Sequence, residues 1–217
     1  MTRPRRFHFN RRTARGFSLI ETLLAMIIIS VGIIAFVDAQ SAFYTSNNWS
    51  SQSATGMFLA NEVREMTRKL PRHDPVTGLT LVSGAAVGWG RESGETTPAD
   101  IDDLDDLDGA KFSNSGGTFV GPVDATRTII PEIDLSGGVP DASIALKGWT
   151  QSITVEKVDP YNFSTVRAAN YEQAATAVNA AIPIDGFPLR VTVVVSFKGV
   201  NDLLDREITR VSWVVYP

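Results

Sequence analysis

The residues best placed to do chemistry in this 217-residue chain are acidic, and they occur in two places. One carboxylate, Glu21, stands alone within an apolar run from Phe17 to Val37. The other place is the segment from Asp100 to Asp108, where six of nine residues are aspartate. A lone ionisable group in a membrane costs about 2.5–3.5 kcal/mol, so Glu21 calls for a cationic partner or an interfacial position. Clustered carboxylate oxygens are the ligands that a hard cation such as Ca²⁺ prefers.

The aspartate-rich segment does not follow the spacing of an EF-hand calcium loop. A register with Gly109 at loop position six puts Leu104 at position one and Ser115 at position twelve, where carboxylates are needed. We therefore expect a solvated acidic loop that binds calcium weakly or not at all, and we expect no cofactor. The weak candidate ligands are Asp102, Asp103, Asp105, Asp106 and Asp108.

Signals for catalysis are sparse in this sequence. There is no cysteine, which excludes a thiolate nucleophile and any disulfide. His73 is the only histidine after residue 16, and prolines flank the segment that contains it. No Gly-x-Ser-x-Gly elbow, phosphate-binding loop or metal-ligand spacing occurs. The sequence predicts that the protein is not an enzyme, and an exported hydrolase is an outside alternative.

The apolar run from Phe17 to Val37 must position Glu21. Its 21 residues would span about 30 Å as a helix, the thickness of the hydrocarbon core of a bilayer, and strands rarely reach this length. Residues 1–16 contain six arginines and no acid, the positive-inside pattern of a cytoplasmic leader. An arginine-rich nucleic-acid arm is the competing interpretation. The remaining 14 basic and 24 acidic residues leave a net charge of −10, which argues against nucleic-acid binding.

The segment Gly16-Phe17-Ser18-Leu19-Ile20-Glu21 resembles the cleavage and methylation signature of type IV prepilins, a family that includes pilins and the pseudopilins of type II secretion. The resemblance covers about the first fifth of the chain. It implies cleavage after Gly16 by a prepilin peptidase, N-methylation of Phe17, and pairing of Glu21 with the amino terminus of a neighbouring subunit. The implied partners are other pilin or pseudopilin subunits, the peptidase and the inner membrane. The C-terminal domain would lie outside the membrane and later in a periplasmic or surface filament.

Other functions remain open at this level. Val37-Asp38-Ala39 offers small residues at which an ordinary signal peptidase could cut, which would make the apolar run a secretory signal. The anchor could also display a binding module whose acidic loop captures a ligand or calcium. Many major pilins carry a helix-breaking proline that is absent between Phe17 and Leu70, which favours a minor pilin or pseudopilin. Pilus, secretion pseudopilus and DNA-uptake filament are all compatible with the sequence.

Apolar spacing of three or four predicts that the helix continues to Leu70, where Pro71 stops it. We expect Phe43 and Trp49 to pack in a core, and local fraying across the Ser- and Asn-rich residues 46–53. The predicted organisation is a leader at 1–16, a transmembrane and assembly helix at 17–40, its continuation at 41–71, and a β-rich globular domain at 72–217.

Alternating residues in the last third of the chain predict strands. Residues 189–197 alternate apolar and polar side chains, and residues 207–216 would return as the second strand of an antiparallel hairpin. Residues 149–156, 79–82 and 128–133 are further predicted strands, and 171–181 forms a short helix or a loop. The predicted fold class is α+β, with a long N-terminal helix packed on a C-terminal antiparallel sheet. The resemblance to prepilins implies the same architecture.

Overall fold

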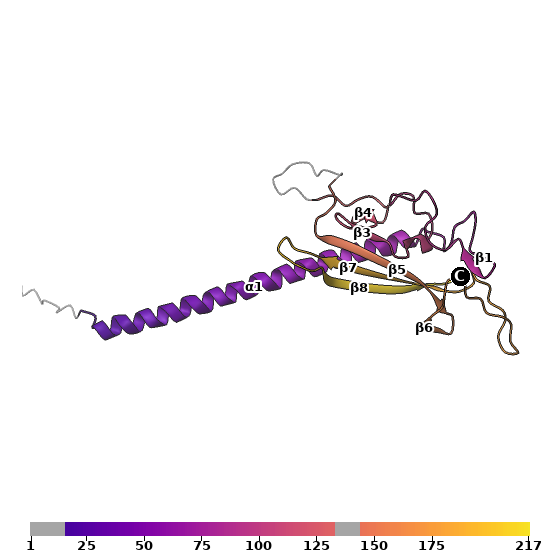
Figure 1. Cartoon of the computed structure of the whole chain (residues 1–217). Helices are drawn as coiled ribbons and strands as arrows, with labels where there is room; N and C mark the ends of the chain where they lie inside the picture. Colours follow the sequence, from indigo (N-terminus) through magenta and orange to yellow (C-terminus); the bar gives the residue numbers. More distant parts are fainter. Residues whose placement is uncertain (1–15, 133–143) are drawn as a thin grey trace, which may run out of the picture. The chain divides into compact units, whose positions relative to one another are not determined.

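The computed structural model describes residues 16–132 and 144–217. It contains one long helix, one short 3₁₀ helix and eight strands within those residues (Figure 1). In chain order they are α1 (Leu19–Thr67), β1 (Thr80–Val82), β2 (Ala85–Val87), η1 (Asp105–Leu107), β3 (Lys111–Ser113), β4 (Phe119–Val120), β5 (Trp149–Asp159), β6 (Asn162–Val166), β7 (Leu189–Phe197) and β8 (Arg206–Val215). The chain divides into two compact units, one ending at Trp49 and the other beginning at Ser50.

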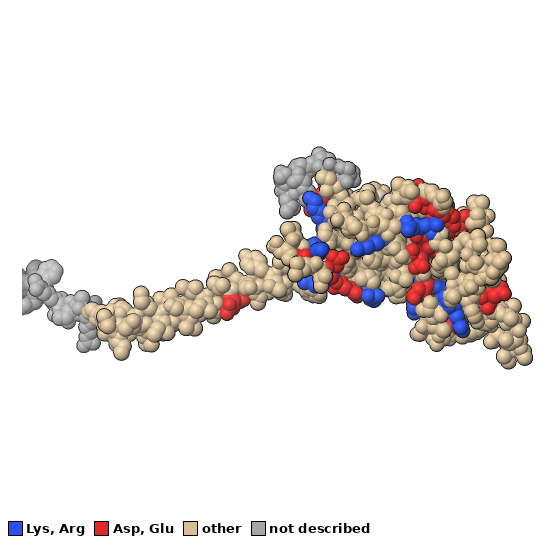
Figure 2. Space-filling view, viewed as in Figure 1, with Lys and Arg blue, Asp and Glu red and all other residues tan. Residues whose placement is uncertain are grey.

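The described part of the first unit is an exposed apolar helix. An 18-residue window of α1 has a mean hydropathy of 2.5 and no buried residue, which is consistent with membrane anchoring. Glu21 and Asp38 are the only charged residues between positions 16 and 49. Figure 2 shows few charged side chains on the visible face of this helix and many on the second unit.

The expectation that Phe43 and Trp49 pack in a core is wrong. Their exposed fractions are 70% and 49%. Helical spacing indicates which face of a helix is apolar, but it does not indicate what covers that face. The predicted fraying is also wrong, because α1 is continuous through residues 46–53. Serine and asparagine cost only a few tenths of a kcal/mol each in a helix, less than a long cooperative helix can absorb.

The second unit packs the end of α1 against a mixed sheet. The strand order is β4-β3-β5-β7-β8, and β6 pairs with β5 (Figure 1). β3 and β4 run parallel, and the other pairings are antiparallel. The buried helix residues recur every three or four positions and belong to the same core as the sheet. They are Gly56, Leu59, Ala60, Val63, Met66 and Thr67. The predicted α+β class is confirmed.

The predicted antiparallel hairpin is present as β7 and β8. The pairing runs from Leu189 with Val215 to Phe197 with Arg206, and its register shifts between Val195 and Ser196. Leu189, Val191, Val193 and Val195 are fully buried and alternate with partly exposed residues, as a period of two predicts, while Phe197 at the end of the strand is partly exposed. α1 also lies close to β8. A Cβ added to Gly56 would lie 2.7 Å from Cγ2 of Ile208 in β8, so only glycine allows α1 to approach the sheet this closely.

The four other strand and helix predictions have different outcomes. The predicted strand at 79–82 is present as β1, and the one at 149–156 is the longer β5. Residues 128–132 make only the isolated bridges Val123–Ile129 and Pro131–Ala145, and position 133 lies outside the described residues. Pro131 has no N–H to donate to a ladder. Residues 171–181 contain no helix. An isolated antiparallel bridge pairs Gln173 in this segment with Ile182 just after it.

Gln151 of β5 joins three parts of the second unit. Its side chain is fully buried, and Oε1 accepts a hydrogen bond from the backbone N–H of Val123 at 2.9 Å. Nε2 donates to the carbonyl oxygens of Leu59 in α1 and of Val123, each at 3.0 Å. A single buried amide thereby satisfies backbone groups of the helix and of a loop, which sequence alternation alone did not indicate.

Candidate functional site

The sequence-predicted processing residues lie just before α1. Gly16 and Phe17 are exposed and precede the first helical residue, Leu19. The side chain of Phe17 is 81% exposed. The Gly16–Phe17 peptide bond is therefore outside the hydrogen-bonded helix, and a peptidase could reach it without first unwinding a helical turn.

Ser18 and Glu21 form a capping box at the start of the helix. Ser18 Oγ accepts from the backbone N–H of Glu21 at 3.3 Å. In return, Glu21 Oε2 accepts from the backbone N–H and the hydroxyl of Ser18, both at 3.3 Å. Reciprocal bonds of this kind satisfy N–H groups that have no partner within the helix. The carboxylate near the membrane-facing end therefore has a structural role, which the Ser-x-x-Glu spacing could have indicated.

The aspartate-rich segment is not the solvated loop that the sequence predicted. Asp103, Asp105 and Asp106 are completely buried, while Asp102 is exposed and Asp108 is half-buried. Ile101, Leu104 and Leu107 recur every third residue and are fully buried in the core, matching the repeat of the 3₁₀ helix that follows. Because these apolar side chains hold the segment in the core, the aspartates between them are buried as well. This threefold spacing was the signal that could have predicted burial.

Five carboxylates from two loop segments converge around η1. Glu92, Glu95 and Asp106 offer oxygens within 4.8 Å of one another, and so do Asp102, Asp103 and Asp106. We call these five residues the acidic cluster. Asp106 belongs to both sets, so it is the centre of the cluster. The glutamates come from the loop that follows β2, and no pattern in the sequence groups them with the aspartates.

Backbone hydrogen bonds hold the acidic cluster in place. Asp106 Oδ2 accepts from the N–H groups of Asp102 at 3.2 Å and Asp103 at 3.3 Å, and Asp103 Oδ1 accepts from Asp106 at 3.1 Å. Glu95 Oε2 accepts from the N–H of Glu92 at 2.8 Å. These bonds use one oxygen each of Asp103, Asp106 and Glu95. Side-chain hydrogen bonds between carboxyl groups also join Asp103 to Asp105 and Glu95 to Asp106.

Two of the predicted candidate ligands have other partners. Asp105 Oδ2 lies 2.8 Å from Nδ1 of His73, a residue 32 positions earlier in the chain. Asp108 Oδ1 accepts from the N–H of Val155 at 3.0 Å and thereby ties the segment to β5. Neither residue belongs to the acidic cluster. Both fasten the aspartate-rich segment to the fold.

The buried groups around η1 titrate far from their ordinary ranges. Burial raises the pKa of Asp103 to about 9 and that of Asp105 to about 6. Burial, followed by the charges of Asp106 and Glu95, raises the pKa of Glu92 to about 7. Burial also lowers the pKa of His73 to about 4, so its contact with Asp105 is a hydrogen bond from a neutral imidazole at neutral pH.

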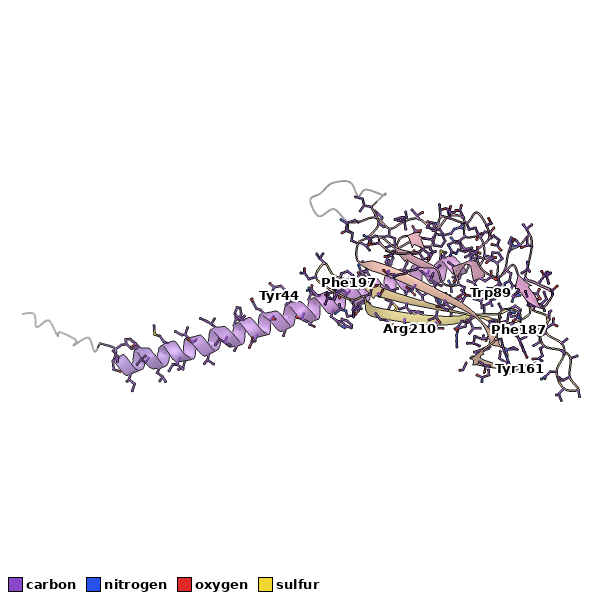
Figure 3. The ribbon with its side chains drawn as sticks, viewed as in Figure 1. Tyr44, Trp89, Tyr161, Phe187, Phe197 and Arg210 are labelled. Atoms are coloured by element: carbon purple, nitrogen blue, oxygen red, sulfur yellow. The ribbon has the colours of Figure 1, made fainter. Side chains whose placement is uncertain are left out.

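His73 does not assemble a catalytic dyad within the described residues. Its Nε2 is buried and has no hydrogen-bond partner there, so no hydroxyl is positioned as a nucleophile. The ring instead packs near Trp89, with the centroids 6.0 Å apart. Lys157 Nζ lies 5.9 Å from the Trp89 ring centre and 5.5 Å from that of Phe187. Figure 3 labels Trp89 and Phe187 near one another in the second unit. Burial lowers the pKa of Lys157 to about 8, and its ammonium donates to the carbonyl oxygens of Ala169 and Tyr171.

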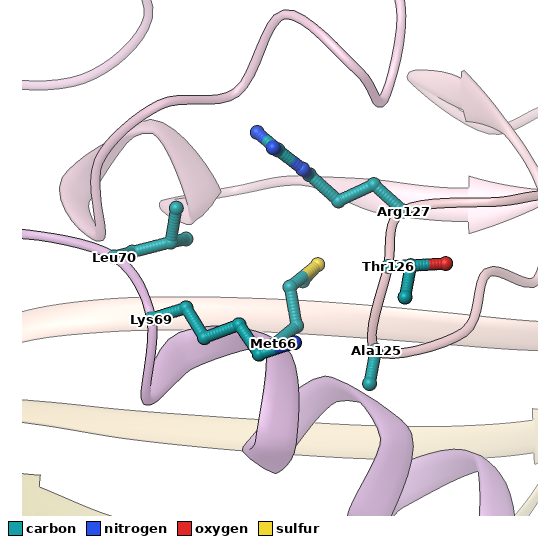
Figure 4. Close-up of a pocket in the computed structure, with 6 residues that line it drawn as sticks. All are labelled: Met66, Lys69, Leu70, Ala125, Thr126 and Arg127. Atoms are coloured by element: carbon teal, nitrogen blue, oxygen red, sulfur yellow. The ribbon is translucent and has the colours of Figure 1, made fainter.

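A pocket beside the end of α1 also lacks catalytic groups. Its lining combines an apolar floor with two cations (Figure 4), and the six residues are Met66, Lys69, Leu70, Ala125, Thr126 and Arg127. Arg127 extends away from the loop, and its guanidinium donates to the carbonyl oxygen of Ile101. That arginine therefore braces the aspartate-rich segment.

Comparison with known proteins bears on the N-terminal segment. Neither the curated proteins nor the solved structures gave a match to this chain. Residues 11–37 match a family model described as the prokaryotic N-terminal methylation motif. The matched residues include the basic-to-apolar junction, Gly16, Phe17 and Glu21. The chain therefore carries the type IV prepilin signature, the mark of a structural rather than an enzymatic family.

Proposed function

We propose that this protein is the precursor of a filament subunit, a minor pilin or a type II secretion pseudopilin. A prepilin peptidase cleaves it after Gly16 and methylates the new amino terminus on Phe17. The mature chain then assembles through the apolar helix of residues 17–40. The methylation motif followed by an exposed apolar helix is the observation that carries this proposal.

Three further features support the proposed organisation. The basic leader at 1–16 precedes an apolar segment, as expected for a precursor whose leader stays in the cytoplasm. The large side chains of residues 17–49 are exposed, so they are available to lipid or to the same helix of other subunits. The helix continuation at 41–71 and the β-rich domain at 72–217 would then be carried on the outer side of the inner membrane and on the filament.

We propose that Glu21 pairs with the positively charged amino terminus of a neighbouring subunit. A carboxylate in an apolar assembly is costly when it is alone, and a cationic partner removes most of that cost. The capping box offers a competing role, because Glu21 also closes the first turn of its own helix. A Glu21→Gln substitution distinguishes the two roles, because glutamine can close a capping box but cannot form an ion pair.

The test compares three variants of the capping box in cells that express the partner subunits. Glu21→Gln keeps the cap and loses the charge, Ser18→Ala weakens the cap and keeps the charge, and Glu21→Ala loses both. We expect both Glu21 variants to reach the membrane, to be cleaved after Gly16, and to enter sheared filaments at least about tenfold less than wild type. Ser18→Ala should assemble, and Asp38→Asn serves as the matched control for loss of a helix carboxylate.

Mass spectrometry of the membrane fraction supplies the second readout. The expected mature chain begins at N-methylated Phe17. A chain that begins at Gln40 would instead identify an ordinary secretory signal and refute the prepilin processing. Wild-type assembly of Glu21→Gln together with loss of assembly in Ser18→Ala would show that Glu21 acts only as a cap.

A further inference from the structure

The loop between β7 and β8 exposes three large apolar side chains within five residues. Val200 is fully exposed, and Leu203 and Leu204 are 92% and 80% exposed. Single exposed apolar residues are ordinary on a protein surface, whereas a group of them on one short loop marks a surface that meets another apolar phase. We call Val200, Leu203 and Leu204 the apolar tip.

Hydrogen bonds within the loop close the turn that carries the apolar tip. The backbone N–H of Gly199 donates to Oδ2 of Asp202 at 2.9 Å, and the N–H of Asp202 donates to the carbonyl oxygen of Gly199 at 3.0 Å. Residues 198–206 contain two basic and two acidic side chains and therefore have no net charge. Attraction of this loop to another surface is consequently apolar rather than electrostatic.

The contacts of β8 fix the direction in which this loop extends. Arg206, the first residue of β8, donates a hydrogen bond to Oε1 of Gln52 in α1. Near the other end of the strand, the guanidinium of Arg64 lies 6.0 Å from the ring centre of Trp213. β8 therefore runs in the same direction as this part of α1 (Figure 1). The loop that precedes β8 thus extends toward the N-terminal side of Gln52.

The chain leads from this side of the second unit to the apolar helix. Phe43 and Tyr44 are 70% and 63% exposed and follow the apolar run that ends at Val37, where aromatic side chains are typical of a membrane interface. The eight residues from Tyr44 to Gln52 rise about 12 Å along a helix. An interfacial layer is about 5–8 Å thick, and the loop can extend about 10 Å beyond β8, so the apolar tip can reach that layer.

We propose that the apolar tip inserts into the surface of the lipid bilayer that holds the apolar helix. The inference rests on the membrane anchoring in the proposed function, but on neither cleavage nor filament assembly. Insertion removes three exposed apolar side chains from water and gives the second unit an attachment to the membrane besides α1. A second copy of the chain is the competing occupant, and the experiment distinguishes it from lipid.

The experiment uses the full-length chain in vesicles of phosphatidylethanolamine and phosphatidylglycerol at a low protein-to-lipid ratio. The acyl chains carry bromine, which quenches a fluorescent probe that contacts them. The sequence has no cysteine, so Asn201→Cys gives a single labelling site in the loop and keeps the whole apolar tip. Val178→Cys is the matched control, because Val178 is 89% exposed in the loop at the opposite end of β7. Val31→Cys reports on the apolar helix itself.

We expect strong quenching of the probes at Val31→Cys and Asn201→Cys and little at Val178→Cys. Adding Leu203→Ser and Leu204→Ser to Asn201→Cys should lower the ratio of lipid-contacting to water-exposed probe at least about tenfold, because burial of a leucine favours an apolar phase by about that factor. Both leucines are exposed, so the urea unfolding of this variant should match that of Asn201→Cys alone.

Three outcomes would overturn the proposal. Weak quenching at Asn201→Cys with strong quenching at Val31→Cys would refute the insertion and leave the membrane anchoring in place. Weak quenching at both positions would refute the anchoring, and the inference with it. Protection of the Asn201→Cys probe from iodide in the water that arises only at a high protein-to-lipid ratio would show that a second copy covers the apolar tip.

Discussion

Replacement of Gln151 by leucine tests how the second unit is held together. The variant keeps the approximate volume of a fully buried side chain and removes three hydrogen bonds, one to the N–H of Val123 and two from Nε2 to the carbonyls of Leu59 and Val123. Leucine can neither donate nor accept. The backbone groups of α1 and of the loop would then face an apolar side chain in the core.

The expected cost follows from these three bonds. Each contributes about 0.5–1.5 kcal/mol net, and a buried N–H left without an acceptor costs about 1–3 kcal/mol. The greater apolar surface of leucine offsets about 1 kcal/mol. We therefore expect Gln151→Leu to lower the free energy of unfolding by about 3 kcal/mol, which corresponds to a fall in Tm of about 6–12 °C for a chain of this size.

The assay is urea unfolding of the full-length chain in detergent micelles, followed by tryptophan fluorescence. Trp149 precedes Gln151 by two positions on the same strand and is only 7% exposed, so its emission reports on this core. Gln173→Leu is the control, because that glutamine is half-buried in a loop. A loss below about 1 kcal/mol with an unchanged urea dependence would refute the assigned role of Gln151.

Two further predictions concern pH and close packing. Stability should fall as the pH rises from 6.5 to 8, below the range in which Lys157, with its pKa lowered by burial to about 8, acts in the opposite direction. Acids whose folded pKa is raised, such as Glu92 to about 7 and Asp103 to about 9, bind more protons when folded, and the stability this confers is lost as the pH rises through those values. His73, with its pKa lowered to about 4, makes stability rise with pH, but only below pH 6.5. A Tm that rises over the stated pH window would contradict the burial of the acids. Gly56→Val should destabilise the second unit by about 1–3 kcal/mol, because its Cβ overlaps β8. Gly32→Val is the control, because a Cβ there meets nothing within 4 Å, and it should leave the unfolding of the second unit unchanged. Equal effects of Gly56→Val and Gly32→Val would contradict the contact between α1 and the sheet.

The features predicted correctly from sequence are those encoded by neighbouring residues. The apolar run predicted α1, and the alternation at residues 189–197, broken only at Val194, predicted β7 with its buried face. Period and length are local properties, so no knowledge of the partner surface was needed. The same holds for the prepilin signature, which lies within one contiguous segment.

The features missed from sequence depend on which segments meet. His73 and Asp105 are 32 residues apart, and Glu92 reaches Asp106 only because of the path of the loop between them. The aspartate-rich segment was predicted to be solvated because its charge count dominates its composition. Its burial follows from the spacing of Ile101, Leu104 and Leu107, whose apolar contacts outweigh the preference of the intervening acids for water.

The amino-acid sequence alone thus determined the prepilin signature, the apolar helix and the β7–β8 hairpin, since each follows from residue type and spacing over a short range. Tertiary structure decided which faces are covered. It left Phe43 and Trp49 exposed, and it placed Gln151 and the acids of η1 in the core. The reason is desolvation, because the cost of burying a charge and the strength of its hydrogen bonds depend on atoms brought together from distant parts of the chain.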